Sequence, residues 1–389
     1  MQEYDKGDET MIFLLQLSAI LAAAAFGGYI CRKLNQPAVL GQLLFGIIIG
    51  PSVLNFVSPT ETFVHMSDLG VILLMFIAGL ETELDEMIRS GKSSFIIAMG
   101  GVVMPIVLGI AASSLFGNSI KEGFFIGVIL AATSVSITVE TLREIDKLRT
   151  RQGMAILGAA VIDDVIGIIL LSLVTGFVNP EESQSFIIVM AKLIAFFIAA
   201  FIVGVVIIRF SRKYFTTKNT SKNIAVIALI FCLLMGYVAE EMGVAAITGA
   251  YLAGMILSAT PFKIKISYSM QEVAYMLLTP IFFVVTGMKV DISHMLYDLP
   301  FGMALLVAAV IGKLMGCGVV AKFLGFGKRE SMQIGIGMIP RGEVALIVTD
   351  IGLKLGVVPK GLFASIIFMI LATTIVTPPF LKKSFEKAV

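Results

Sequence analysis

The segment "AILGAAVIDDVIGIILLSLVTG", residues 155–176, is apolar over the length that a helix needs to cross a lipid bilayer, yet it carries two aspartates near its middle. Burying Asp163 or Asp164 in hydrocarbon costs about 3 kcal/mol on insertion scales. Acidic side chains at the centre of a span usually pair with a base or mark an ion path. The segment therefore predicts a membrane helix that contributes an ion site, with two helix-packing polar groups as the alternative.

The composition agrees with a polytopic membrane protein. The chain of 389 residues is 58% hydrophobic and 14% charged, and its net charge of +2 gives no indication of nucleic-acid binding. The three cysteines, Cys31, Cys232 and Cys317, lack metal-ligand spacing, so no metal centre or cofactor is predicted from them. The function is expected to lie within the membrane.

Hydropathy predicts an all-α protein with thirteen transmembrane helices. Each predicted helix is an apolar run bounded by polar or turn-forming residues. The predicted ranges are 11–30, 37–54, 68–87, 94–116, 123–142, 153–176, 186–208, 223–239, 244–260, 272–287, 301–323, 332–350 and 361–380.

The basic residues predict an orientation in the membrane. Alternate connections between the predicted helices carry 21 Lys and Arg residues in one set and five in the other. Cytoplasmic loops accumulate these residues, so we expect an extracellular N-terminus and a cytoplasmic C-terminus in the cell membrane.

The chain also matches itself at an offset of 208 residues. "AVLGQLLFGIIIG" (38–50) aligns with "AITGAYLAGMILS" (246–258) at five of thirteen positions, and the register persists without a gap. Chance matches between glycine-rich helices are the alternative. We interpret the match as two inverted six-helix repeats, 1–183 and 215–389, joined by a connector helix within 184–214, an architecture typical of secondary transporters.

We single out five ionisable residues within predicted spans as candidates for the ion site or its counter-ions, namely Asp163, Asp164, Lys313, Arg341 and Glu343. Adjacent helical positions point about 100° apart, so the two aspartates cannot both face one partner. One carboxylate is expected to meet Lys313 while the other faces a cavity, where it can exchange a proton for a monovalent cation. Lys313 itself is either a proton carrier or a structural counter-ion.

Two polar interruptions occupy corresponding positions of the repeats. "IPRGEV" places Pro340 and Gly342 around Arg341, a sequence that breaks a helix. The equivalent stretch, "AATSVS" (131–136), contains the hydroxyls of Thr133, Ser134 and Ser136. Arg341 and Glu343 are interpreted as supporting residues or as a structural ion pair, and the hydroxyls as site residues or helix-packing groups.

Taken together, these motifs resemble the monovalent cation:proton antiporters of the NapA and Kef branch. The resemblance rests on the "DD" at 163–164, the lysine in "GKLMG", "TSVSI", "GLETEL" at 79–84 and "PRGEVAL" at 340–346, and it covers essentially the whole chain. Kef-type potassium systems carry a Gln-Asp pair and a cytoplasmic nucleotide-binding domain, whereas this chain has Asp-Asp, so regulation by nucleotide is not expected.

The resemblance implies an antiporter that exchanges Na⁺, with K⁺ and Li⁺ as further cations, for H⁺. It implies an NhaA/NapA-like fold in a homodimer, with a dimerisation domain from helices one to three and eight to ten. The remaining repeat helices would form a mobile core that moves like an elevator, and helices five and twelve would be broken and cross. Asp164, with Thr133 and Ser134, would hold the metal cation, and Asp163 would pair with Lys313. Similarity to a spore-germination member of this branch adds germination and the spore membrane as expected context.

Three other functions are alternatives to cation:proton exchange for a membrane protein with embedded aspartates. An intramembrane aspartyl protease needs two aspartates on separate helices that share a proton, which adjacent residues cannot do. A cation channel needs a filter, and the sequence has no such motif. A sodium-coupled solute symporter on the same fold is the closest alternative, and transport that requires an organic solute would identify it.

Overall fold

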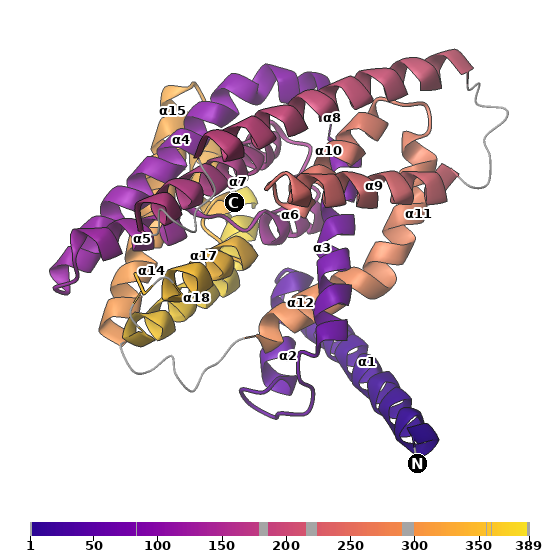
Figure 1. The fold of residues 1–389 in the computed structure, drawn as a ribbon, viewed down its shortest axis with the longest axis horizontal. Helices are drawn as coiled ribbons and strands as arrows, with labels where there is room; N and C mark the ends of the chain where they lie inside the picture. Colours follow the sequence, from indigo (N-terminus) through magenta and orange to yellow (C-terminus); the bar gives the residue numbers. More distant parts are fainter. Residues whose placement is uncertain are drawn as a thin grey trace.

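A computed structural model describes residues 2–82, 84–178, 186–214, 224–289, 299–354, 356–358 and 360–386. The described chain is entirely helical (Figure 1). The first half comprises α1 (Gln2–Lys33), α2 (Ala38–Ile49), α3 (Glu61–Glu81), α4 (Leu84–Leu115), α5 (Ile120–Ala131), α6 (Val135–Glu144), α7 (Arg151–Val178) and α8 (Phe186–Tyr214). The second half comprises α9 (Ile224–Glu241), α10 (Ala246–Ser258), α11 (Lys263–Val273), the π-helix η2 (Ala274–Leu278), α12 (Thr279–Met288), α14 (Leu299–Lys313), the π-helix η3 (Leu314–Val319), α15 (Val320–Phe323), α16 (Lys328–Gly337), α17 (Glu343–Lys354) and α18 (Lys360–Phe385).

The helices have the length and surface of membrane spans. Among the described residues, ten helical stretches are long and apolar enough to cross a bilayer. Three shorter apolar helices cover residues 38–49, 246–258 and 344–353. Large apolar side chains on the outside are exposed, including Phe201 at 73% and Met276 at 77%. A lipid-facing surface explains this exposure, since water would disfavour it. The protein is a multi-pass membrane protein.

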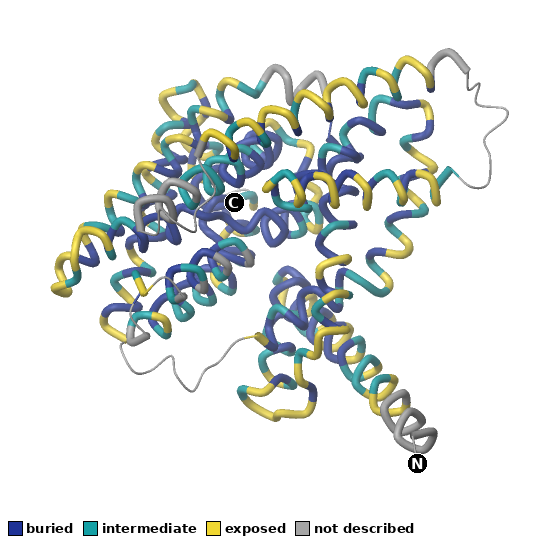
Figure 2. The backbone as a smooth tube through the Cα atoms, in the orientation of Figure 1, coloured by how far each residue is buried: buried dark blue, intermediate teal, exposed yellow. Residues whose placement is uncertain are grey.

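The centre of the molecule is formed by short, buried helices. Figure 2 shows that α6 is buried along most of its length, whereas α8 and α9 carry exposed residues on their outer sides. The predicted helix 123–142 is two helices, because residues 132–134 are not helical. Residues 338–342 likewise separate α16 from α17. Pro340 explains the second break, since proline lacks the N–H that a continuous helix would use.

Some predicted boundaries were wrong. The helix predicted at 68–87 runs from Glu61 to Glu81, and the one predicted at 272–287 begins at Lys263. Hydropathy detects only the apolar part of a helix, so polar turns such as "KIKISYS" were missed. The C-terminal end at Glu81 is set by the backbone of Thr82, which turns to an extended conformation (ψ 135°).

Helix boundaries recur 208 residues apart. The correspondence holds for the ends of α1 and α9, the starts of α2 and α10, the ends of α4 and α15, the starts of α5 and α16, and the starts of α6 and α17. Both helix breaks therefore fall at equivalent positions of the sequence, and no insertion separates the two series of helices.

Candidate functional site

The predicted contact between an aspartate of α7 and the lysine of α14 is present. Nζ of Lys313 donates to Oδ2 of Asp163 over 2.9 Å, and the two side chains are 0% and 1% exposed. Lys313 is the last residue of α14, directly before the π-helical turn η3. π-Helical turns frequently occur at functional sites, because they redirect side chains that a regular helix would place elsewhere.

The first helix break contributes a second donor to the same carboxylate. Oγ1 of Thr133 donates to Oδ2 of Asp163 over 2.6 Å, so this oxygen accepts two hydrogen bonds. Among the described residues, the other oxygen, Oδ1, is buried without a hydrogen-bond partner. A buried carboxylate oxygen in that position is a potential acceptor for a proton, a water molecule or a cation.

Asp164 follows Asp163 in the same turn of α7 and is only 5% exposed. Helix geometry directs its side chain about 100° away from that of Asp163. The site thus combines one carboxylate bound to a lysine with a second buried carboxylate on an adjacent face of α7.

The two helix breaks meet each other. The backbone N–H of Ser134 donates to the carbonyl oxygen of Pro340 over 2.7 Å, and Oγ1 of Thr138 donates to the carbonyl oxygen of Gly337 over 2.6 Å. Oγ of Ser134 lies 3.2 Å from Oγ of Ser136, and both serines are buried. The C-terminal ends of α5 and α16 and the N-terminal ends of α6 and α17 therefore lie at one crossing, where unpaired backbone groups can bind ions.

The Arg341 side chain stabilises the second helix break through hydrogen bonds to backbone carbonyls. Its guanidinium donates to the carbonyl oxygens of Met338 (3.0 Å), Ile339 (2.7 Å) and, at 3.4 Å, Ala309, and the residue is fully buried. Its positive charge lies at the C-terminal end of α16, where the helix dipole favours a cation. The side chain of Glu343, predicted as a possible partner, lies outside the described side chains, so the predicted ion pair stays a prediction.

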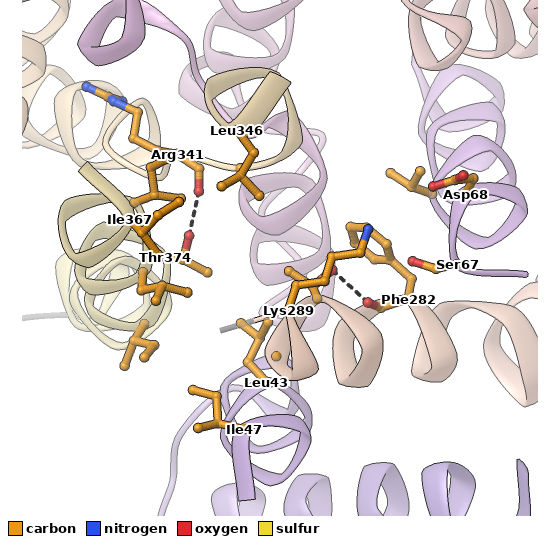
Figure 3. A pocket seen from close by; sticks show the side chains of 17 residues that line it. Leu43, Ile47, Ser67, Asp68, Phe282, Lys289, Arg341, Leu346, Ile367 and Thr374 are labelled. Atoms are coloured by element: carbon orange, nitrogen blue, oxygen red, sulfur yellow. Dashed lines mark hydrogen bonds between the residues drawn. The ribbon is translucent and has the colours of Figure 1, made fainter. Parts of the chain in front are cut away.

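A cavity of about 80 Å³ lies beside this crossing (Figure 3). Residues of α2, α3 and α12 line one side, and Arg341, Leu346, Ile367 and Thr374 line the other. Figure 3 shows the Arg341 side chain turned away from Asp68, and Oγ1 of Thr374 donates to the Arg341 carbonyl oxygen over 2.5 Å. We call this cavity the Asp68 cavity.

A second cavity, of about 520 Å³, lies at the C-terminal end of α3, beside Glu81. Its lining is mostly charged: Glu81, Glu140, Arg143, Glu144, Asp146, Leu148, Arg149 and Gln271. We call it the Glu140 cavity. From the sequence, Arg143 and Arg149 were assigned to a cytoplasmic connection, Glu81 and Glu140 were placed near the ends of the predicted helices 68–87 and 123–142, and no site role was proposed for any of them. A sequence pattern that could have indicated this cavity is "SITVETLRE" (136–144), where Glu140 and Glu144 are four residues apart and so share one side of a helix whose other faces are largely apolar.

Comparisons with known proteins place the chain in a family. Residues 20–385 match the family described as "Sodium/hydrogen exchanger, transmembrane". The chain is 38% identical to the Na(+)/H(+)-K(+) antiporter GerN of Bacillus cereus over 96% of both proteins. It is 40% identical to the probable Na(+)/H(+) antiporter GerT of the same organism, over 96% of this chain and 100% of that protein.

A solved structure has the same fold. The sodium proton antiporter MjNhaP1 from Methanocaldococcus jannaschii superimposes with a TM-score of 0.77 over 96% of each chain, at 17% sequence identity. The family was correctly predicted from the aspartate pair and the motifs around the helix breaks. The chain belongs to the sodium/hydrogen exchanger family, whose members are secondary transporters and not enzymes.

Proposed function

We propose that this protein exchanges Na⁺, and also K⁺ or Li⁺, for H⁺ across a membrane. The observation that carries the proposal is the buried pair of carboxylates on α7, of which Asp163 is bound to Lys313 while Asp164, one helical position further, is expected to face about 100° away. Family membership and the names of the relatives, which are Na⁺/H⁺ antiporters, support the same activity.

The proposed ligands for the cation are Asp164, Thr133 and Ser134, with backbone carbonyls freed by the helix breaks. Oxygen ligands suit hard monovalent cations. A cation and a proton cannot both occupy the Asp164 carboxylate, so binding of one releases the other. This competition is sufficient for exchange if the site opens alternately to each side of the membrane.

Contacts related by the 208-residue offset support the proposed inverted repeat. A methyl group added to Gly79 would collide with the carbonyl oxygen of Tyr251, and one added to Gly287 would collide with that of Leu43. Gly287 and Tyr251 are the positions 208 residues after Gly79 and Leu43. The same helix contact therefore occurs twice with the roles of the halves exchanged, as a two-fold axis requires.

Equivalent residues that touch each other mark such an axis. Gly70 faces the carbonyl oxygen of Leu278, and Gly342 faces the side chain of Ser134; in each pair the two positions are 208 residues apart. An axis through both pairs would pass through the crossing of the breaks. The Asp68 cavity is lined by residues of α3 between 67 and 71 and the Glu140 cavity by Glu81 at its C-terminal end, so the two lie at different levels along this helix, consistent with access from either side.

We further propose thirteen spans, with an extracellular N-terminus and a cytoplasmic C-terminus, supported by the 21-to-5 distribution of basic residues. The repeats would be 1–183 and 215–389, with 184–214 as connector. Helices one to three and eight to ten would form the dimerisation domain of a homodimer, and the remaining repeat helices an elevator-type core. A role in germination, in the cell or spore membrane, is proposed from the names of GerN and GerT.

Reconstituted protein tests the proposed exchange directly. Proteoliposomes with an imposed pH gradient, reported by a trapped dye, should lose the gradient when Na⁺, Li⁺ or K⁺ is added. Asp164→Asn should abolish the response, whereas Asp164→Glu should retain part of it because the carboxylate survives. Indifference of the wild type to all three cations, or near-normal exchange by a folded Asp164→Asn variant, would contradict the proposal. Exchange that requires an added organic solute would instead identify a symporter.

A further inference from the structure

The Glu140 cavity and the helix crossing are connected by one face of α6. Ser136, Glu140 and Glu144 are spaced four residues apart, which places them on the same side of the helix. Ser136 lies at the crossing, within 3.2 Å of Ser134, and Glu140 follows about 6 Å further along the axis. A polar face therefore leads from the cavity towards the aspartate pair.

Glu140 differs from the other acids that line the cavity. Glu81 lies 3.4 Å from Nε of Arg143 and also accepts from Gln271, and Glu144 accepts two bonds from the backbone N–H of Ala38, at 2.6 and 2.7 Å. Glu140 accepts one bond, from the neutral hydroxyl of Tyr275 over 3.3 Å. Among the described residues, no basic side chain lies within 4 Å of its carboxylate.

The groups around Glu140 come from α6 itself and from α3 and η2. Arg143, one turn away, is drawn towards α3 and η2, because it pairs with Glu81 and its Cζ lies 3.8 Å from the centre of the Tyr275 ring. The Tyr275 hydroxyl, from η2, donates to the Glu140 carboxylate over 3.3 Å. Among the described residues, the Glu140 carboxylate thus has no ion-pair partner within 4 Å, although it lies between the cavity and the crossing.

The second repeat lacks this polar face. The positions equivalent to Ser136, Glu140 and Glu144 are Val344, Val348 and Gly352 on α17. Val348 is 2% exposed and belongs to an apolar core. The acid therefore occurs on one side of the crossing alone and is not required by the packing that the repeats share.

We infer that Glu140 receives the cation as it passes between the Glu140 cavity and the aspartate pair, on one side of the membrane only. The inference rests on the proposed exchange activity and adds a residue to its path. A carboxylate in a narrow cleft raises the local cation concentration and the rate of entry. Removing its charge should weaken apparent cation affinity from that side, while leaving the maximal rate, which depends on the aspartate pair.

The experiment compares Glu140→Gln with Asp146→Asn in vesicles of both orientations. Asp146 lines the same cavity but is exposed, and its positive φ of 54° is a conformation that asparagine also adopts. Modification of an Asp146→Cys variant by an impermeant thiol reagent identifies the membrane face on which the cavity opens. Glu140→Gln should raise the Na⁺ concentration for half-maximal exchange roughly tenfold from that face, at the low end of electrostatic enhancement, and leave the other face unchanged.

Other outcomes would distinguish a role of Glu140 in cation entry from an effect of the cavity's net charge or a purely structural role. Equal shifts for Asp146→Asn and Glu140→Gln would overturn it, because the effect would then belong to the net charge of the cavity. An unchanged Glu140→Gln would overturn it as well. Glu140→Asp keeps the charge and should stay within about twofold of the wild type; a loss as large as that of Glu140→Gln would indicate a structural role only. Failure of the wild type to exchange cations would instead contradict the proposed function.

Discussion

Nζ of Lys313 lies 2.9 Å from Oδ2 of Asp163, with neither side chain more than 1% exposed. Breaking such a pair from one side leaves a buried charge without its partner, at a cost of about 3–5 kcal/mol. We expect Asp163→Asn and Lys313→Gln each to lower the apparent melting temperature in detergent. The double variant should be more stable than the sum of the single effects predicts, since neither charge then remains. Strictly additive losses would show that the pair contributes no coupling energy.

The same ion pair leads to a prediction about the net charge moved during exchange. If Lys313 releases its proton when a cation binds beside Asp164, more than one proton moves per cation and transport is electrogenic. We expect wild-type exchange in proteoliposomes to change with an imposed membrane potential, and residual exchange by Lys313→Gln to be independent of it. Unchanged potential dependence in an active Lys313→Gln variant would assign the lysine a structural role.

Thr133 holds the shared oxygen of Asp163 with a short hydrogen bond of 2.6 Å. A hydrogen bond to a charged group contributes about 1.5–3 kcal/mol, and a hydroxyl at this position is also a proposed cation ligand. Thr133→Val should therefore raise the Na⁺ concentration for half-maximal exchange by roughly tenfold or more, whereas Thr133→Ser should stay close to the wild type. Equal behaviour of the two variants would exclude a role for the hydroxyl.

Much of the site was predictable because charges are rare within membrane spans. Asp163, Asp164 and Lys313 could be selected as candidates from their depth alone, and their opposite charges predicted a contact. Pro340 and Gly342 predicted a helix break for a physical reason, since one lacks a donor and the other lacks a side chain. The structure has the predicted contact and the predicted break.

Other features depend on tertiary contacts that a hydropathy pattern cannot contain. Arg341 was expected near a carboxylate, but its described hydrogen bonds go to backbone carbonyls, which have no signature in the sequence. Arg143 was counted as a loop charge and Glu140 as a residue without a role near the end of the predicted helix 123–142, because their partners on α3 and η2 lie more than sixty residues away along the chain. The π-helical turn beside Lys313 was not predicted either, since no residue type specifies it.

Close helix contacts through glycine provide a separate test of the two-fold arrangement. A methyl group on Gly79 would collide with backbone of α10, and one on Gly287 with backbone of α2, so neither helix pair can accommodate alanine without moving apart. Overpacking of this kind costs about 1–3 kcal/mol.

We expect Gly79→Ala and Gly287→Ala to lower the apparent melting temperature by similar amounts, because the two sites are equivalent under the proposed axis. Gly167, in the interior of α7, has no atom within 4 Å of an added methyl group and serves as the matched control. Gly167→Ala should be neutral or stabilising by about 0.5–1 kcal/mol, since alanine favours the helix. Destabilisation by only one of the two buried variants would contradict equivalence of the halves, and destabilisation by Gly167→Ala would show that the effect comes from the backbone and not from helix packing.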